Sequence, residues 1–143
     1  MHRDMWRHEN MGPGQRQRLL RAMSMLPRQC VAPRYDPGHF YDSYVKFFLY
    51  GDSRQPIAEH MRIFNKVGLA YGYMIDNAYI VDLEKKIEFL LSAVIAANPK
   101  QEYCGDYAYD QIGFPFLANL GRAVYGFELE RPRTRLPDLS EFE

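Results

Sequence analysis

Apolar residues recur at helical spacing in three parts of the chain. Residues 15–26 and 115–128 each place leucine, methionine or phenylalanine side chains on one face, and the aromatic segment 38–50 has a similar pattern. These three segments are therefore predicted to be helices. The polar opening, residues 1–14, predicts a flexible arm, and residues 131–143 predict a frayed tail.

Between the second and third predicted helices the pattern changes to one typical of strands. We expect strands at 62–72, 77–83 and 87–97, with the polar sequence Asp-Leu-Glu-Lys-Lys forming a tight turn between the last two. The almost wholly apolar third strand is typical of a central strand covered on both faces. Helices, then an antiparallel sheet, then a covering helix predict an α+β fold.

Composition limits the classes of protein that this chain can represent. With 143 residues, 47% of them hydrophobic and 25% charged, it has the size and character of one globular domain. The formal net charge is zero, so no nucleic-acid partner is expected, and the arginines of the first quarter are interpreted as a solvated helix face. There is no transmembrane run, so no membrane partner is expected. There is also no apolar signal core, so as written the chain is not addressed for export.

The two cysteines and four histidines predict neither a metal site nor a cofactor. Cys30 and Cys104 have no metal-ligand spacing, and the histidines are scattered. The two cysteines could pair in an oxidising compartment or remain isolated thiols, and the sequence favours neither state.

A lysine and a glycine stand out within the first predicted strand. Lys66 interrupts a strand-forming run, and Gly68, two residues later, gives up side-chain packing. One explanation is an edge strand that carries lysine to discourage aggregation. The other is an ammonium aimed into a cleft, beside a glycine that lets a ligand approach the backbone.

Asn-Lys-Val-Gly on a strand, followed by a hairpin and a closing aromatic helix, resembles the C-terminal part of the serine β-lactamase and penicillin-binding-protein family. More closely, the chain looks like the bacterial class A β-lactamase-related serine hydrolases. The resemblance covers residues 15–130 and implies a partial β-lactamase/transpeptidase-like fold. That family is exported or periplasmic, which leaves the localisation of this chain open.

The family motif on that strand is Lys-Thr/Ser-Gly, at the border of the active site. The resemblance implies that Lys66 is the motif lysine, which binds the substrate carboxylate region and tunes proton transfers. Gly68 would leave room for substrate, and the backbone N–H of Leu69 would be an oxyanion-hole donor. Val67 departs from the pattern because it has no hydroxyl, which puts antibiotic recognition in doubt.

The nucleophile motif of the family, Ser-x-x-Lys, is expected far upstream of the lysine strand. Ser43-Tyr44-Val45-Lys46 fits the spacing but lies only a short way before Lys66, so we interpret it as a chance match with a solvent-facing Ser43. Ile75-Asp76-Asn77 is expected to fall in a strand connection and does not replace the Ser-Asp-Asn loop of the family.

These observations predict the C-terminal portion of a serine hydrolase that is inactive alone, either truncated or a relic. Its substrate would be a small acyl compound, if another segment completes the site. The alternative is a non-catalytic interaction or assembly module that forms homo-oligomers through an exposed sheet or aromatic surface. A nucleic-acid-binding domain ranks a distant third.

Overall fold

The computed structural model describes residues 12–103 and 105–142. Most of the arm predicted at 1–14 lies outside the described residues, and its last two residues already belong to the first helix. The main elements are α1 (Pro13–Ser24), β1 (Met61–Ala70), β2 (Tyr73–Asp82), β3 (Ile87–Ala96) and α3 (Phe114–Glu130). Shorter turns occupy Pro27–Gln29, Asp42–Val45, α2 (Phe47–Tyr50), Tyr109–Gly113 and Ser140–Phe142. The α+β class is confirmed.

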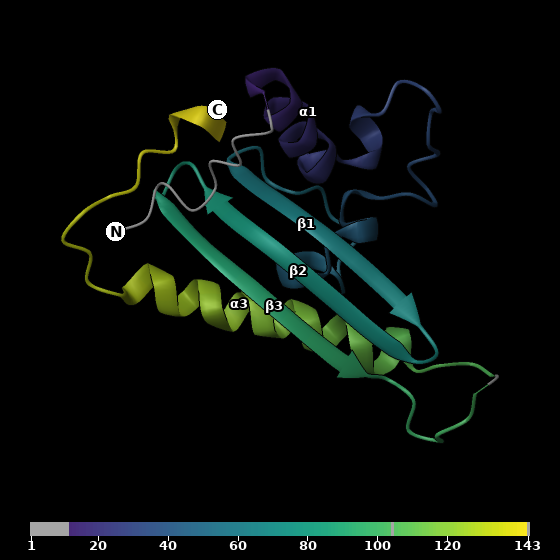
Figure 1. Ribbon diagram of the computed structural model, residues 1–143. Helices are drawn as coiled ribbons and strands as arrows, with labels where there is room; N and C mark the ends of the chain where they lie inside the picture. The colour runs from purple at the N-terminus through teal and green to yellow at the C-terminus, as the bar shows by residue number, and fades with distance from the viewer. Residues whose placement is uncertain (1–11, 104, 143) are drawn as a thin grey trace.

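The described strands form one antiparallel sheet in the order β1-β2-β3 (Figure 1). The turn predicted after Asp82 joins β2 to β3, as expected. The turn between β1 and β2 was not foreseen: it has only two residues, Tyr71 and Gly72, both with positive φ (51° and 84°). This is the backbone conformation of a tight hairpin. Strand β2 consequently starts at residue 73, not 77, and Ile75-Asp76-Asn77 lies within it, not in a connection.

One face of the sheet is covered by α3 and the turn α2 (Figure 1). Helix α3 approaches this turn closely at Gly121, where a Cβ atom would lie 2.5 Å from the backbone nitrogen of Leu49. We call this the helix face of the sheet. On β2 it carries fully buried side chains, including Met74 and Ile80.

The prediction that the third strand is central was wrong. Strand β3 is an edge of the described sheet, and on the face away from α3 its Leu90 and Val94 are 67% and 59% exposed. An apolar run cannot distinguish a strand covered on both faces from an edge strand that leaves one face open. The residue pattern is the same in both cases.

The helix predicted at 38–50 is also wrong, and buried polar side chains explain why. The Asp42 carboxylate accepts a hydrogen bond from the Ile57 backbone N–H at 2.9 Å, and the Ser43 hydroxyl donates to the carbonyl of Ser53. Leu49 has a φ of 70°, outside the helical region. Long-range bonds to the backbone thus replace the local bonds of a helix, and only the short turns 42–45 and 47–50 form.

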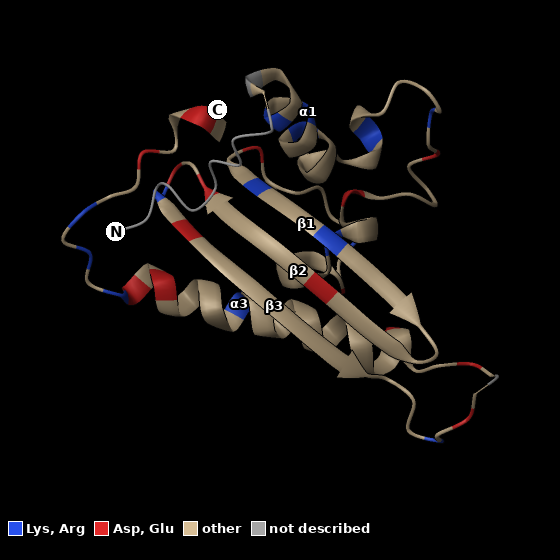
Figure 2. Ribbon diagram, in the orientation of Figure 1, with Lys and Arg blue, Asp and Glu red and all other residues tan. Residues whose placement is uncertain are grey.

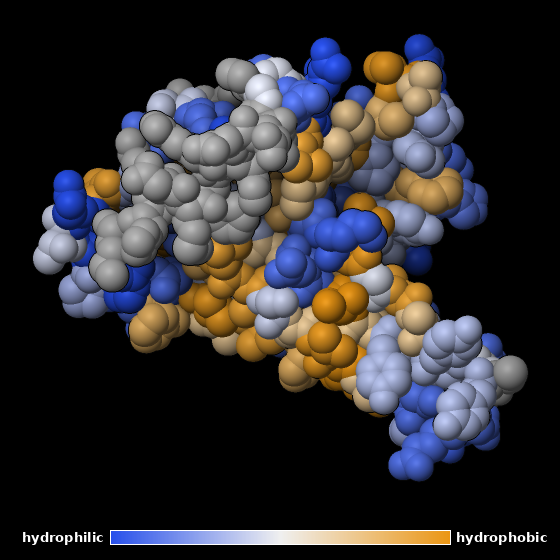
Figure 3. Space-filling view, in the orientation of Figure 1, coloured by the Kyte–Doolittle hydropathy of each residue, from blue (hydrophilic) through white to orange (hydrophobic). Residues whose placement is uncertain are grey.

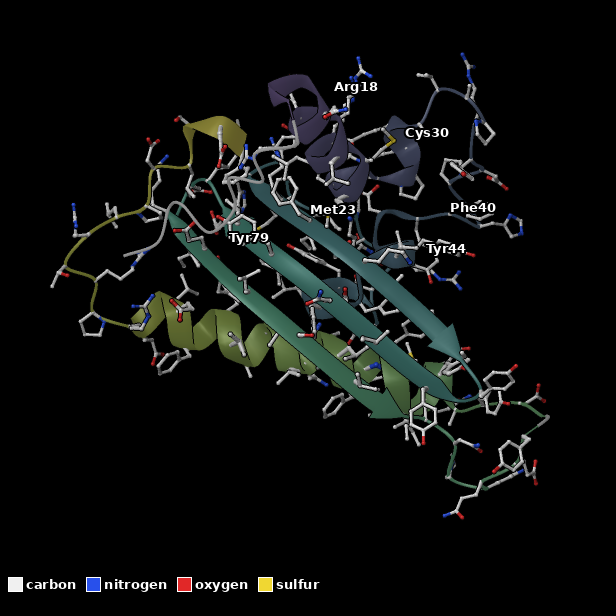
Figure 4. All side chains as sticks on the ribbon, viewed as in Figure 1. Arg18, Met23, Cys30, Phe40, Tyr44 and Tyr79 are labelled. Atoms are coloured by element: carbon white, nitrogen blue, oxygen red, sulfur yellow. The ribbon has the colours of Figure 1, made fainter. Side chains whose placement is uncertain are left out.

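The frayed tail expected after residue 130 packs onto the sheet instead. Leu139 and Phe142 are 1% and 9% exposed and form a small second core with Phe64 and Tyr79 on the face opposite α3. Met23 of α1 packs against this cluster, and in Figure 4 it lies close to Tyr79. One end of this second face is therefore covered.

Charged residues are sparse on the strands and more frequent in the helices and loops (Figure 2). None of the described helices is long and apolar enough to cross a membrane.

Candidate functional site: the open face of the sheet

The four residues that the resemblance selects all lie on the edge strand β1, but they divide between its two faces. Lys66 and Gly68 lie on the face away from α3, while Val67 and Leu69 alternate onto the helix face. The Lys66 side chain is exposed, as expected, and its ammonium donates to the Val67 carbonyl at 2.8 Å. The structure therefore brings the lysine and the glycine together and places the other two side chains elsewhere.

Lys66 and Gly68 belong to a larger surface that is exposed in the described part of the chain, and we call it the open face. Along the register, Lys66 is opposite Asn77, and Asn77 is opposite Ser92. The next row is mostly apolar. The open face comprises Lys66, Gly68, Tyr73, Ile75, Asn77, Leu90, Ser92 and Val94. Figure 3 shows this side of the molecule, with hydrophobic side chains gathered over the strands around a hydrophilic centre.

Gly68 also has a packing role that does not involve a ligand. A Cβ atom at this position would lie 3.0 Å from Cγ2 of Ile75, its partner on β2. That separation is tighter than most carbon contacts in proteins, so the glycine makes room for the isoleucine. The sequence alone offered ligand approach as the reason for this glycine, and the structure adds a second reason.

Ser43 and Lys46 do not form a nucleophile–base pair. Ser43 is buried, which corrects the prediction that it faces solvent, and its hydroxyl donates to the Ser53 carbonyl. The Lys46 ammonium donates to three other groups, the carbonyls of Met23 and Ile63 and the amide oxygen of Asn65. The interpretation of Ser-x-x-Lys as a chance match is consistent with these contacts.

Lys46 belongs to a buried polar network that the sequence analysis missed. Its side chain is 2% exposed, and its ammonium lies 2.7 Å from Oδ1 of Asn65. The Asn65 amide nitrogen donates to Oδ1 of Asp76 at 2.9 Å, and Oδ2 of Asp76 accepts from the backbone N–H groups of Phe47 and Phe48. A chain of hydrogen bonds thus links a buried cation to a buried carboxylate.

Burial shifts the pKa of both ends of this network towards the neutral form. Desolvation lowers the pKa of Lys46 to about 8, against the attraction of the Asp76 carboxylate. Desolvation also raises the pKa of Asp76, although its hydrogen bonds to Asn65, Phe47 and Phe48 act in the opposite direction. Ionisable groups with such pKa shifts occur at functional sites and also in structural networks.

The network lies directly behind the candidate site, because Asn65 is the residue before Lys66. Successive residues of a strand point to opposite faces, so Asn65 enters the core while Lys66 emerges on the open face. A polar residue at an inward position of β1, and a lysine directly before the apolar Phe47 and Phe48, were the sequence signals for this network.

Another buried carboxylate, Asp82, has a structural role. It accepts hydrogen bonds from the backbone N–H groups of Glu84 and Lys85 in the β2–β3 turn and from the hydroxyl of Tyr125 at 2.6 Å. Burial, and then the bond to Asp82, raise the pKa of Tyr125. These contacts join the turn to α3.

Neither of two hollows found on the described surface includes the lysine strand. One, of about 190 Å³, lies within the loop 98–111, and the other, of about 350 Å³, lies between the start of β3 and residues 128–137. Among the described residues, no cluster of three or more His, Cys, Asp or Glu side chains could hold a metal ion. Cys30 has a free thiol, and Cys104 lies outside the described residues.

The chain matches no family model, no curated protein and no solved structure.

Proposed function

We propose that this chain is the lysine-bearing portion of a β-lactamase-like serine hydrolase, in which a second segment supplies the nucleophile. The observation that supports it is the placement of Lys66 and Gly68 side by side on the uncovered face of an edge strand. In such a site the ammonium would bind the carboxylate of an acyl substrate, and the edge backbone at Leu69 would donate to the developing oxyanion.

The described residues contain no activated serine facing this lysine, so the proposal requires completion. The open face has the character expected of a surface that another layer covers, because it places exposed Ile75, Leu90 and Val94 around polar groups. Covering it would also exclude water from Lys66 and strengthen its electrostatic action.

Acylation by a penicillin-type probe, followed by mass spectrometry of the intact chain, tests the proposal. The isolated chain should carry no adduct. The chain co-produced with the segment encoded upstream should give a complex labelled on a serine of that segment. Lys66→Met should lower the labelling rate at least tenfold, because it removes the only charge that the proposal assigns to substrate binding. Lys100→Met, which removes an exposed lysine from a distant loop, is the matched control.

Two outcomes would contradict this proposal. A stoichiometric adduct on Ser43 of the isolated chain would identify a different serine acylase. Equal labelling of the parent and Lys66→Met complexes would remove Lys66 from the site.

A non-catalytic interaction module remains the second candidate, and the same exposed apolar side chains favour it. It predicts a stable complex with the upstream segment in which no serine is labelled.

A further inference from the structure

Among the described residues, no strand pairs with the outer edge of β3, which is a long row of backbone donors and acceptors. Within the described residues the sheet ends at β3, and this strand has ten residues without a proline. Glu88 is its single charged residue. Natural proteins protect exposed edges with charges, prolines, bulges or a covering element, and β3 has few of these devices.

The helix face of β3 is only partly covered. Phe89, Leu91 and Ile95 are half-buried, whereas the residues of β2 on the same face, such as Met74 and Ile80, are fully buried. The apolar side chains on the helix face are therefore less well covered on β3 than on β2.

Helix α3 extends beyond this edge. Figure 1 shows its C-terminal half projecting past β3, away from β2. One flank of the helix is held by Arg122, which binds Asp52 and the Leu49 carbonyl. The opposite flank carries Phe116, Leu120 and Phe127 at helical spacing, and Phe127 is 64% exposed. We define the β3 flank as the outer edge of β3 together with these three side chains.

The β3 flank matches the requirements of an added strand. Such a strand would satisfy the backbone groups of β3 and place alternate side chains beneath the projecting part of α3. A second copy of this chain is a poor occupant. A two-fold axis perpendicular to the sheet would place both α3 helices on the same side, where the projecting half of each would collide with the first half of the other. A two-fold axis in the plane of the sheet would place the two starts of β3 side by side, so that the arginines lining one copy would face those of the other.

The end of the β3 flank beside the start of β3 is basic. The hollow of about 350 Å³ at this place is lined by Lys86, Arg131, Arg133 and Arg135, against the two acids Glu88 and Glu128. Arg131 is already paired with Glu128 at 2.6 Å. Arg133 donates to the backbone carbonyls of Lys85 and Lys86, which do not neutralise its charge. An acidic residue at the end of an added strand would complement this positive charge.

We propose that the β3 flank binds an extended, apolar segment of a different polypeptide, which adds as a fourth strand and places an acidic end in the basic hollow. This proposal does not depend on the chemistry of Lys66, because the β3 flank and β1 are opposite edges of the sheet.

The direct test uses a fluorescein-labelled peptide with the sequence of residues 87–96, extended by three aspartates. This peptide is a strand of suitable side-chain pattern without an attached helix, so the collision between helices does not apply. A control peptide with prolines in place of its two central residues lacks one backbone donor on each edge. Fluorescence anisotropy measures binding to the full chain, and hydrogen exchange reports protection of the β3 amides.

The expected result is saturable binding with a dissociation constant in the micromolar range and slower exchange of the β3 amides. The proline peptide should bind at least tenfold more weakly. Phe127→Asp, an exposed position on the β3 flank, should weaken binding at least tenfold. Val31→Asp, at an exposed apolar position in a loop, should leave it unchanged. Circular dichroism checks that both variants fold.

Absence of saturable binding at millimolar peptide would overturn the proposal, as would equal effects of Phe127→Asp and Val31→Asp. A stable dimer of the chain in light scattering, dissociated by Phe127→Asp, would overturn it in favour of self-association. These measurements do not use the acylation probe. A failure of probe labelling in the complex would therefore leave the peptide-binding result unchanged, and this proposal and the proposed function can fail separately.

Discussion

Asn65 and Lys66 are neighbours in β1 that serve opposite sides of the sheet. The Asn65 amide bridges the Lys46 ammonium and the Asp76 carboxylate in the core, while the Lys66 ammonium is exposed on the open face. The strand that presents the candidate site is therefore held from behind by a buried network. Changes on the two sides should have different effects.

Lys46→Met should destabilise the fold by about 3–5 kcal/mol at pH 7, because it leaves Asp76 as a buried charge without its cation. It also leaves the carbonyls of Met23 and Ile63 without their ammonium donor. Urea denaturation followed by circular dichroism measures the free energy of unfolding. Lys66→Met, at an exposed position, should change this free energy by less than about 0.5 kcal/mol.

The stability difference between the parent chain and Lys46→Met should grow as the pH rises from 8 to 10.5. The pKa of Lys46 is lowered from 10.5 to about 8 by burial, so in this interval the unfolded state binds more protons than the folded state. Stability must therefore rise with pH, by up to about 3 kcal/mol across the interval. Parallel denaturation series at four pH values measure it, and a constant difference would contradict the lowered pKa of Lys46 in the folded state.

Gly121→Ala should destabilise the fold by about 1–3 kcal/mol, because the added methyl group would lie 2.5 Å from the Leu49 backbone nitrogen. Gly126→Ala is a matched control in the same helix. No atom lies within 4 Å of its added methyl group, so it should stabilise the chain by about 0.5–1 kcal/mol through helix propensity. Thermal unfolding distinguishes the two signs.

Gly68→Ala separates the two explanations for this glycine. If packing against Ile75 dominates, the substitution should cost about 1 kcal/mol, and most of that cost should disappear in an Ile75→Ala background. A double-mutant cycle of unfolding free energies measures the coupling. Stability unaffected by Gly68→Ala would leave ligand approach as the remaining reason for the glycine.

Ser43→Ala should lower the unfolding free energy by about 1 kcal/mol, because the hydrogen bond from the buried Ser43 hydroxyl to the Ser53 carbonyl is lost. Neither the parent chain nor Ser43→Ala should be labelled by a penicillin-type probe. Measured labelling of the parent chain that disappears in this variant would instead make Ser43 a nucleophile.

Strong local periodicity made much of the fold predictable. The segments predicted at 15–26 and 115–128 are helices within two residues at each end, and the strand predicted at 87–97 is displaced by one residue at most. The segment 38–50 failed because its apolar spacing is helical while Asp42, Ser43 and Lys46 bond to distant backbone groups. Local propensity carries no information about such partners.

The candidate site was predictable to a similar extent. Strand alternation suffices to expose Lys66, but the interaction of Lys46 with Asn65 joins residues 19 positions apart. Whether β3 is a central or an edge strand likewise depends on the order of strands in the sheet, and the pattern of residues along one strand does not give that order.

The ion pair between Arg16 and Glu141, at 2.6 Å, joins α1 to the segment that ends at Phe142. Both segments rest on the same end of the sheet, over Phe64 and Tyr79, and each buries apolar side chains of the other. The two extremities of the described chain are thus one cooperative unit of the core. A shortened protein that stops after α3 would lose more than the residues removed, because α1 would lose its contacts with Leu139, Phe142 and Glu141 and would detach at lower denaturant than the sheet.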